Sequence, residues 1–224
     1  MLRFTGDTHG EQGRFCNFWA IGEEEWTEKD TLIVCGDFGY IFKNDSVENI
    51  FLNELEKKKY NICFCCGNHE NFDALEQYAI EEWNGGKVHR IRKNIFHLMR
   101  GQIYTIDNKK IFSFGGAYSI DRYMRTEHFS WWNQEIPCDE EYDEAIKNLE
   151  LHNHKVDYIV THTAPREIIR RMGYYPDAHD AELTGFLEWV MYEVKYEEWF
   201  FGHWHRDEQI DEKHRAIWFD VEER

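Results

Sequence analysis

The 224-residue chain has little proline, no long apolar run and a shortage of positive charge. Only three residues are proline and 42% are hydrophobic, which is typical of a folded globular protein and excludes a disordered one. No segment approaches the roughly twenty consecutive apolar residues that span a bilayer. The apolar run at the N-terminus is too short for a signal peptide, so we expect a cytoplasmic protein without a membrane partner.

The shortage of positive charge limits the classes of partner. Lys and Arg total 26 against 43 Asp and Glu, which gives a formal net charge of −17. Such a field repels polyanions, so non-specific binding of nucleic acid is disfavoured. A pair of divalent cations in an acidic pocket would still create a local cationic site. We therefore expect a small or specifically docked substrate, and the oligomeric state is left open.

The six cysteines do not form a recognisable framework. Their spacing is unlike that of a disulfide-rich secreted protein, and a cysteine-based zinc site would need a second close pair that the sequence lacks. Three of them lie in the stretch NICFCCGNH, which predicts a buried strand with free thiols.

The chain has no internal repeat, low-complexity tract or linker, so we expect a single domain over residues 1–224. Five short apolar runs, each followed by a polar turn, predict buried strands: LRF, TLIVC, NICFCC, DYIV and EEWFF. Helix-like stretches lie between them, which indicates an α/β core with the polar turns at the carboxyl edge of the strands. Neighbouring strands in the middle and at the end, including RAIWFDVE, indicate mixed sheets.

The turns carry eight side chains that suit Mn, Fe, Zn or Ni: Asp7, His9, Asp37, Asn68, His69, His162, His203 and His205. In an extended segment residues i and i+2 point to the same side, so His203 and His205 can share one cavity while Trp204 faces away. One metal needs three or four ligands. The larger set, with a carboxylate able to bridge, fits a two-metal centre that clamps a displacement at phosphorus.

Each motif alone has a simpler explanation. An isolated Asp-x-His is a weak signal, and Asn68 in Gly-Asn-His-Glu could merely cap a helix. An isolated His162 would more often be structural than a metal ligand. Five such turns in order, each after an apolar run, are hard to obtain by chance.

The ordered motifs Asp-x-His, Gly-Asp, Gly-Asn-His-Glu, His and Gly-His-x-His resemble the calcineurin-like metallophosphoesterase superfamily. The matching positions run from Asp7 to His205, which is nearly the whole chain. The resemblance implies an α/β fold, a four-layer αββα sandwich of two mixed β-sheets flanked by helices. It also implies a dinuclear metal site at the carboxyl ends of the strands, with Mn favoured among the candidate metals.

The resemblance also implies a role for each position. The first metal would be held by Asp7, His9 and His205, and the second by Asn68, His162 and His203. Asp37 would bridge both metals, whereas His69 would stand near the leaving-group oxygen as a catalytic residue. The activity implied is metal-dependent hydrolysis of a phosphomonoester or phosphodiester by in-line attack of a metal-bridging hydroxide.

The chain departs from some relatives after Asp37. Its turn lacks the Asp-Arg-Gly continuation whose arginine grips phosphate in protein serine/threonine phosphatases. We predict a substrate-loop insertion around residues 115–137, in which Arg122 or Arg125 supplies the missing phosphate contact. Trp131 and Trp132 in the same loop either stack on a flat substrate group or pack the loop onto the domain.

Two alternatives remain beside this interpretation. A nuclease or nucleotide pyrophosphohydrolase could use the same two metals, and a non-catalytic protein-interaction scaffold could keep the same fold. Scaffolds typically have eroded sites, and the full ligand set here favours catalysis. The remaining histidines, including His89 and His97, show no partner pattern and are expected at the surface or in the core.

Overall fold

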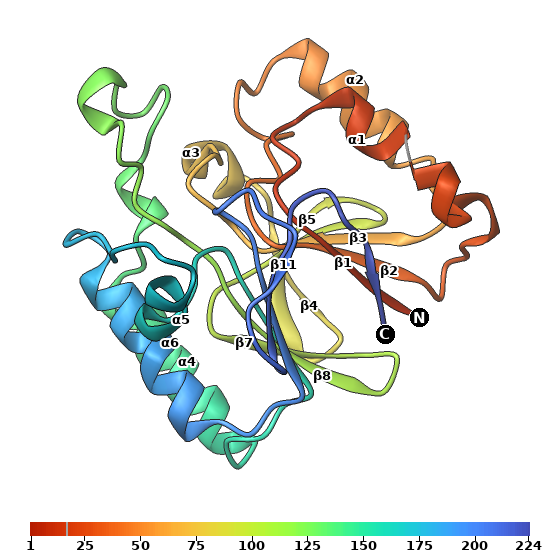
Figure 1. Ribbon diagram of the computed structural model, residues 1–224. Helices are drawn as coiled ribbons and strands as arrows, with labels where there is room; N and C mark the ends of the chain where they lie inside the picture. The colour runs from red at the N-terminus through yellow and green to blue at the C-terminus, as the bar shows by residue number, and fades with distance from the viewer. Residues whose placement is uncertain (17) are drawn as a thin grey trace.

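A computed structural model describes residues 1–16 and 18–224, which form two mixed β-sheets with helices on their outer faces (Figure 1). The first sheet has seven strands in the spatial order β13 (Glu222–Glu223), β1 (Leu2–Thr5), β2 (Thr31–Val34), β3 (Asn61–Phe64), β6 (Ile95–Leu98), β5 (Gly86–Arg92) and β4 (Ile80–Trp83). The second has six strands in the order β11 (Glu208–Gln209), β12 (His214–Ala216), β10 (Glu198–Phe201), β9 (Tyr158–Thr161), β8 (Lys109–Phe114) and β7 (Gln102–Ile106).

The helices divide between the two sheets. The first sheet is covered by α1 (Gln12–Cys16), α2 (Ser46–Leu55) and α3 (Phe72–Leu75), together with the short 3₁₀ turns η1 (Phe18–Ile21) and η2 (Glu23–Glu25). The second sheet is covered by α4 (Asp139–Leu151), α5 (Arg166–Arg171) and α6 (Ala181–Glu193). Two further 3₁₀ turns, η3 (Arg122–Met124) and η4 (Asn133–Glu135), lie in the segment 115–137.

The side chains of the central strands alternate between two apolar clusters. On β2, Leu32 and Val34 pack against the helices, whereas Ile33 packs into the cluster between the two sheets. In that inner cluster Phe4 of the first sheet stacks on Phe200 of the second, with ring centroids 4.1 Å apart. A strand that is buried on both faces reads as a continuous apolar run, which is why these strands were recognisable. The predicted αββα sandwich is confirmed.

Parallel pairing brings the predicted turns to common edges. In the first sheet β1, β2 and β3 are parallel neighbours, and in the second β9 and β10 are parallel neighbours. Antiparallel strands complete both sheets, so the prediction of mixed sheets is confirmed. The carboxyl ends of these five strands are where a doubly covered α/β sheet places its chemistry.

The C-terminal segment differs from its prediction as one last strand. Instead, it forms β12 in the second sheet and β13 in the first, and it crosses between the sheets at Trp218 and Phe219. The reason is a turn held by Asp207, whose carboxylate accepts hydrogen bonds from the backbone N–H groups of Trp218, Phe219 and Asp220 at 2.8–3.1 Å. Among the described helices, none is both long and apolar enough to cross a bilayer.

Candidate metal centre

The turns that follow the five parallel strands meet where the two sheets face one another. The backbone N–H of His203, after β10, donates to Asp7 Oδ1 at 3.0 Å, after β1. His162 Nδ1, after β9, lies 3.0 Å from the carbonyl oxygen of Cys35, after β2. The two sheets therefore contribute jointly to one cluster of polar side chains.

The backbone in these turns is unusual. His9, Asp37, His203 and His205 all have left-handed φ angles, of 47°, 47°, 66° and 47°. The expectation that both histidines of His-x-His lie on an extended segment is therefore wrong, although Trp204 does face away and stacks on Tyr174. A non-glycine residue in this region costs about 1–3 kcal/mol and is typically found at functional sites.

Close approach explains the glycines that precede the donors. A Cβ on Gly67 would lie 2.1 Å from Asp37 Oδ1, and a Cβ on Gly202 would lie 2.1 Å from Asp7 Oδ1. Both separations are far below van der Waals contact, so any side chain would push a carboxylate out of the cluster. The Gly-Asn-His and Gly-His patterns thus have a steric basis.

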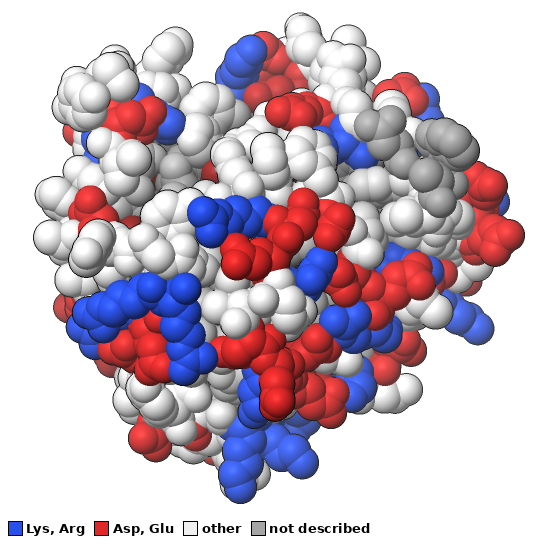
Figure 2. Space-filling model, viewed as in Figure 1, with Lys and Arg blue, Asp and Glu red and all other residues white. Residues whose placement is uncertain are grey.

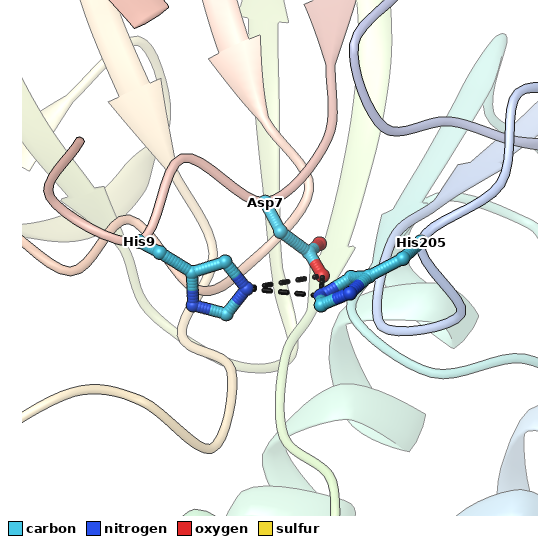
Figure 3. A group of neighbouring side chains, drawn as sticks. All are labelled: Asp7, His9 and His205. Atoms are coloured by element: carbon cyan, nitrogen blue, oxygen red, sulfur yellow. Dashed lines mark hydrogen bonds and ion pairs between the residues drawn. The ribbon is translucent and has the colours of Figure 1, made fainter. Parts of the chain in front are cut away.

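Asp7, His9 and His205 form the first group of donors (Figure 3). The Nε2 atoms of the two histidines are 2.9 Å apart, and His205 Nε2 lies 3.0 Å from Asp7 Oδ2. Asp7 is buried, whereas His205 is exposed and stacks on Trp218 with ring centroids 5.0 Å apart. No sequence motif points to Trp218, because it lies thirteen positions after His205 and adjoins it through the crossover between the sheets.

Asn68, His162 and His203 form the second group. His162 Nε2 lies 3.0 Å from Asn68 Oδ1 and 3.2 Å from His203 Nδ1. Because the Cys35 carbonyl accepts a hydrogen bond from Nδ1 of His162, Nε2 is the nitrogen that faces the other donors. The ring orientation is therefore set by the backbone of the neighbouring strand.

Asp37 lies between the two groups. One of its oxygens is 3.8 Å from His9 Nδ1 and the other is 3.4 Å from His162 Nε2. Oδ1 also accepts hydrogen bonds from the backbone N–H groups of Asn68 and His69, at 2.9 and 2.8 Å. The structure thus brings together all seven predicted ligand positions, and their role as ligands stays a prediction.

His69 is close to the same cluster. Its ring centroid is 5.1 Å from that of His9, and it forms a third candidate donor group with His9 and Asp37. Arg125 Nη2 lies 3.1 Å from His69 Nε2. The geometry therefore allows His69 to act either as a further ligand or as the group beside the leaving oxygen, which was the sequence-based expectation.

The donor set has an excess of negative charge that a cation would neutralise. Burial opposes protonation of His162, but the Asp37 carboxylate outweighs burial and raises the pKa of His162 to about 10. Burial likewise would raise the pKa of Asp37, yet His162 holds it well below its usual value. Two buried carboxylates and an amide oxygen, beside imidazole nitrogens that lie 2.9 and 3.2 Å apart in two pairs, fit divalent metal ions.

Glu70 does not join the cluster. Its side chain is fully buried and accepts hydrogen bonds from the backbone N–H groups of Phe38 and Gly67, both at 2.7 Å. Burial and the nearby Asp37 charge raise the pKa of Glu70 to about 8. The Glu70 carboxyl group therefore holds the Gly-Asp and Gly-Asn turns in place.

The segment 115–137 approaches the cluster through two residues that the sequence did not single out. Ser119 Oγ accepts a hydrogen bond from Asn68 Nδ2 at 3.1 Å, and Glu135, which is fully buried, binds Ser119. Arg122 forms an ion pair with the same Glu135 at 2.5 Å and lies over the rings of Tyr118 and Trp131.

The position of Trp132 decides between the two alternatives for this residue, which were stacking on a substrate and packing the loop onto the domain. It is 1% exposed, packs in the core of the first sheet and donates to Asp73 Oδ2 at 2.8 Å, so it packs the loop and offers no stacking face to a substrate. Of the two arginines, only Arg125 is in contact with the candidate site.

A cavity of about 400 Å³ opens directly beside the cluster. Its lining includes His9, His69 and several residues between Gly39 and Phe51. The donors are thus accessible from a space large enough for a small organic molecule.

Comparison with known proteins agrees with the geometry. The sequence model of a family described as calcineurin-like phosphoesterase matches residues 2–207, which include every candidate donor. A comparison with curated proteins gave no match. The match covers most of the 224 residues, and the two mixed sheets and the Asp/His groups have the arrangement expected of that family. The chain therefore belongs to the calcineurin-like phosphoesterase family and is a phosphoester hydrolase.

Proposed function

We propose that the chain is a dinuclear metallophosphoesterase that hydrolyses a phosphomonoester or phosphodiester. The observation that carries the proposal is the convergence of two buried carboxylates, one amide oxygen and four imidazoles from both sheets on one cluster. Mn²⁺ is the first choice of metal, and the use of Mn²⁺ and a cytoplasmic location remain predictions from the sequence.

The donors divide naturally into two sets. We assign Asp7, His9 and His205 to one ion, and we assign Asn68, His162 and His203 to the other. Asp37 is assigned to both because its two oxygens face His9 and His162, one from each set. The seven positions are the ones that the sequence motifs predicted.

The metals and the protein have separate tasks. When bound, two divalent ions supply a nucleophile near neutral pH and stabilise the negative charge on the phosphoryl oxygens. The backbone N–H groups of Asn68 and His69 fix the orientation of Asp37, and the Cys35 carbonyl fixes the tautomer of His162. Because these contacts are already made, little reorganisation accompanies the reaction.

His69 is assigned to the departing oxygen. It lies at the wall of the 400 Å³ cavity, adjacent to His9, where its imidazole can give a proton to an alkoxide or stabilise it by a hydrogen bond. Such assistance typically contributes about 10²–10⁴-fold to the rate. We assign Arg125, which contacts His69, to a phosphoryl oxygen of the substrate.

The proposal is tested by hydrolysis of bis-p-nitrophenyl phosphate and p-nitrophenyl phosphate, with Mn²⁺ added or with EDTA. We expect turnover of at least one ester that depends on added metal and is abolished by the chelator. The preferred ester distinguishes diester from monoester chemistry. A lack of metal-dependent turnover on both compounds and on a broader phosphoester panel would support a non-catalytic scaffold instead.

A further inference from the structure

The 400 Å³ cavity beside His9 and His69 has both apolar and polar side chains in its lining. Tyr40, Phe42 and Phe51 line it, and the Phe42 ring centroid lies 6.0 Å from that of His69. Val47, which is 53% exposed, lies at the start of α2 and completes the apolar lining. Because the cavity adjoins the donors, the organic part of a phosphoester held there can contact these apolar side chains.

The charges that line the cavity disfavour a second phosphate. Among the described residues of the lining, Lys43 is the only Lys or Arg, and it is accompanied by Asp45 and Glu48. The Glu48 carboxylate accepts hydrogen bonds from the backbone N–H groups of Phe42, Lys43 and Asn44 at 2.6–3.2 Å, so its charge is fixed in the wall. A phosphate in this space would meet more negative than positive side chains.

We propose that this cavity binds the organic part of the substrate and selects an uncharged, flat group, such as an aryl or nucleoside moiety, over a second phosphate. The proposal rests on the function proposed above and narrows it. It favours simple phosphoesters of uncharged alcohols and disfavours the alternative of a nucleotide pyrophosphohydrolase.

A binding experiment tests the cavity without turnover. Phenylphosphonate and methylphosphonate are titrated calorimetrically into the Mn²⁺-loaded protein, since neither is a hydrolysable ester. Loss of one aromatic contact is typically worth about tenfold in affinity. We therefore expect Phe42→Ala to weaken phenylphosphonate about tenfold and to change methylphosphonate by less than about twofold. Equal effects on both compounds, or no effect on either, would overturn the proposal.

A second pair of variants avoids the core, because Phe42 also packs against Trp132. Val47→Glu places a carboxylate at the exposed mouth of the cavity, and Ile50→Glu places the same charge on the same helix, at a position that is 58% exposed and outside the lining. The affinity for phenylphosphonate should fall severalfold in Val47→Glu and stay unchanged in Ile50→Glu. Equal affinities of the two variants for phenylphosphonate would show that the cavity does not bind the substrate.

Turnover separates the two proposals. The wild-type protein should hydrolyse 1-naphthyl phosphate with a kcat/KM at least about tenfold above that for pyrophosphate, and Phe42→Ala should narrow this ratio. A preference for pyrophosphate contradicts only the cavity proposal. A lack of metal-dependent turnover on every phosphoester contradicts the proposed function itself.

The amide of Asn68 is held from behind by a separate network. The Glu135 carboxylate accepts hydrogen bonds from Ser119 N at 2.8 Å and from Ser119 Oγ at 2.9 Å. Since that hydroxyl proton is donated to Glu135, Ser119 Oγ must accept from Asn68 Nδ2, and Asn68 Oδ1 is then turned toward His162. Arg122 Nε donates to the same Glu135 carboxylate at 2.6 Å and balances its buried charge.

From this network we infer that Ser119 and Glu135 are positioning residues, which orient the Asn68 oxygen for a metal ion. Ser119→Ala should weaken Mn²⁺ binding at one of the two ions by about tenfold to hundredfold, the range typical of partners of metal ligands. Ser113→Ala is the matched control, because Ser113 is equally buried but lies on β8.

The measurements are calorimetric Mn²⁺ titration and thermal unfolding in EDTA. A merely structural role would lower the melting temperature without changing the Mn²⁺ affinity, and that result would overturn the inference. Glu135→Gln gives an independent check, because glutamine can donate to Ser119 and so no longer dictates the Asn68 orientation. Glu135→Gln should therefore also weaken the binding of one of the two Mn²⁺ ions.

Discussion

Two of the closely spaced imidazole pairs in this molecule differ in their surroundings. His203 Nδ1 lies 3.2 Å from His162 Nε2 in the candidate metal centre, with the rings at 71°. His89 Nδ1 lies 3.0 Å from His97 Nδ1 within the first sheet, with the rings stacked at 13°. The second pair arises from regular strand pairing, because His89 and His97 are direct partners on β5 and β6.

The difference is in charge and in backbone. Asp7 and Asp37 adjoin the first pair, and Asp37 raises the pKa of His162 against the effect of burial. Burial lowers the pKa values of both His89 and His97, and the charged groups that act on His97 are themselves basic. Close imidazoles alone therefore do not indicate a metal centre. The buried carboxylates and the left-handed turns that bring them together are what distinguish it.

The largest effect is expected from removing the Asp37 carboxylate, which we assign to both ions. His162 would then lose the nearest negative charge that sets its pair apart from His89 and His97. Asp37→Asn should abolish binding of at least one metal ion and lower turnover by about 10³-fold or more, as loss of a central catalytic carboxylate does. Metal content is measured by plasma mass spectrometry after dialysis. His97→Phe is the control and should keep both ions. Two full equivalents of metal in Asp37→Asn would contradict the assignment of Asp37.

Substitution of His69 distinguishes a metal ligand from a proton donor at this position. His69→Asn should retain both metal ions and lose about 10²–10⁴-fold in kcat on an unactivated alkyl phosphoester. The loss on a p-nitrophenyl ester should be much smaller, because a good leaving group needs little protonation. If the metal content falls, His69 is a ligand, as its proximity to His9 and Asp37 allows. If turnover of the alkyl ester is unchanged, the proton-donor role is wrong.

The two arginines of segment 115–137 should separate function from stability. Arg125→Ala should lower kcat/KM about tenfold, because Arg125 contacts His69, and should leave urea unfolding nearly unchanged. Arg122→Ala should destabilise the protein by about 1–3 kcal/mol, because it leaves the buried Glu135 carboxylate without its positively charged partner. Unchanged kinetics in both variants would remove this loop from substrate binding.

Segment 115–137 also shows a surface difference within the molecule. In Figure 2 charged side chains crowd the lower and right-hand parts of the visible face, whereas the part where this green segment of Figure 1 lies is mostly uncharged. Its exposed apolar side chains are Ile120, Tyr123, Met124 and Phe129. The strongly negative total charge therefore does not describe every region of the surface.

The strands and the positions of the candidate donors were predictable from the sequence because they repeat one local pattern. Each apolar run ends at a glycine or threonine followed by Asp, Asn or His, and parallel pairing brings those ends together. The pattern failed where geometry is set by distant residues. Asp207 turns the C-terminal segment between the sheets, and nothing near residue 218 in the sequence indicates this.

The supporting residues were not predictable for a related reason. Ser119 and Glu135 act on Asn68 through contacts that span 51 and 16 positions in the chain, and neither lies in a recognisable motif. His89 and His97 showed no partner pattern in the sequence and were expected at the surface or in the core; they are buried, and the register of β5 and β6 pairs them. Motifs identify side chains that contact a ligand, whereas register and loop packing determine which residues hold them.

The smallest expected effect concerns the second histidine pair and the dependence of stability on pH. Burial lowers the pKa of His97, so the unfolded chain binds a proton near pH 6.5 that the folded protein does not. Stability is then highest above this pH and falls as the pH is lowered. Three charged residues surround the pair. They are Arg100, its ion-pair partner Glu141, and Glu76, and all three line a second cavity together with His89 and His97.

His97→Phe should therefore reduce the loss of unfolding free energy between pH 7 and pH 5 by about 1 kcal/mol, because one of the two suppressed protonations is removed. Urea unfolding of the wild type and the variant in EDTA at both pH values measures this difference, and the metal centre and the carboxylates contribute equally to both proteins. An unchanged difference would show that the buried pair does not resist protonation. The contrast with the candidate metal centre would then rest on its buried carboxylates and its backbone geometry, since resistance to protonation would no longer mark the second pair.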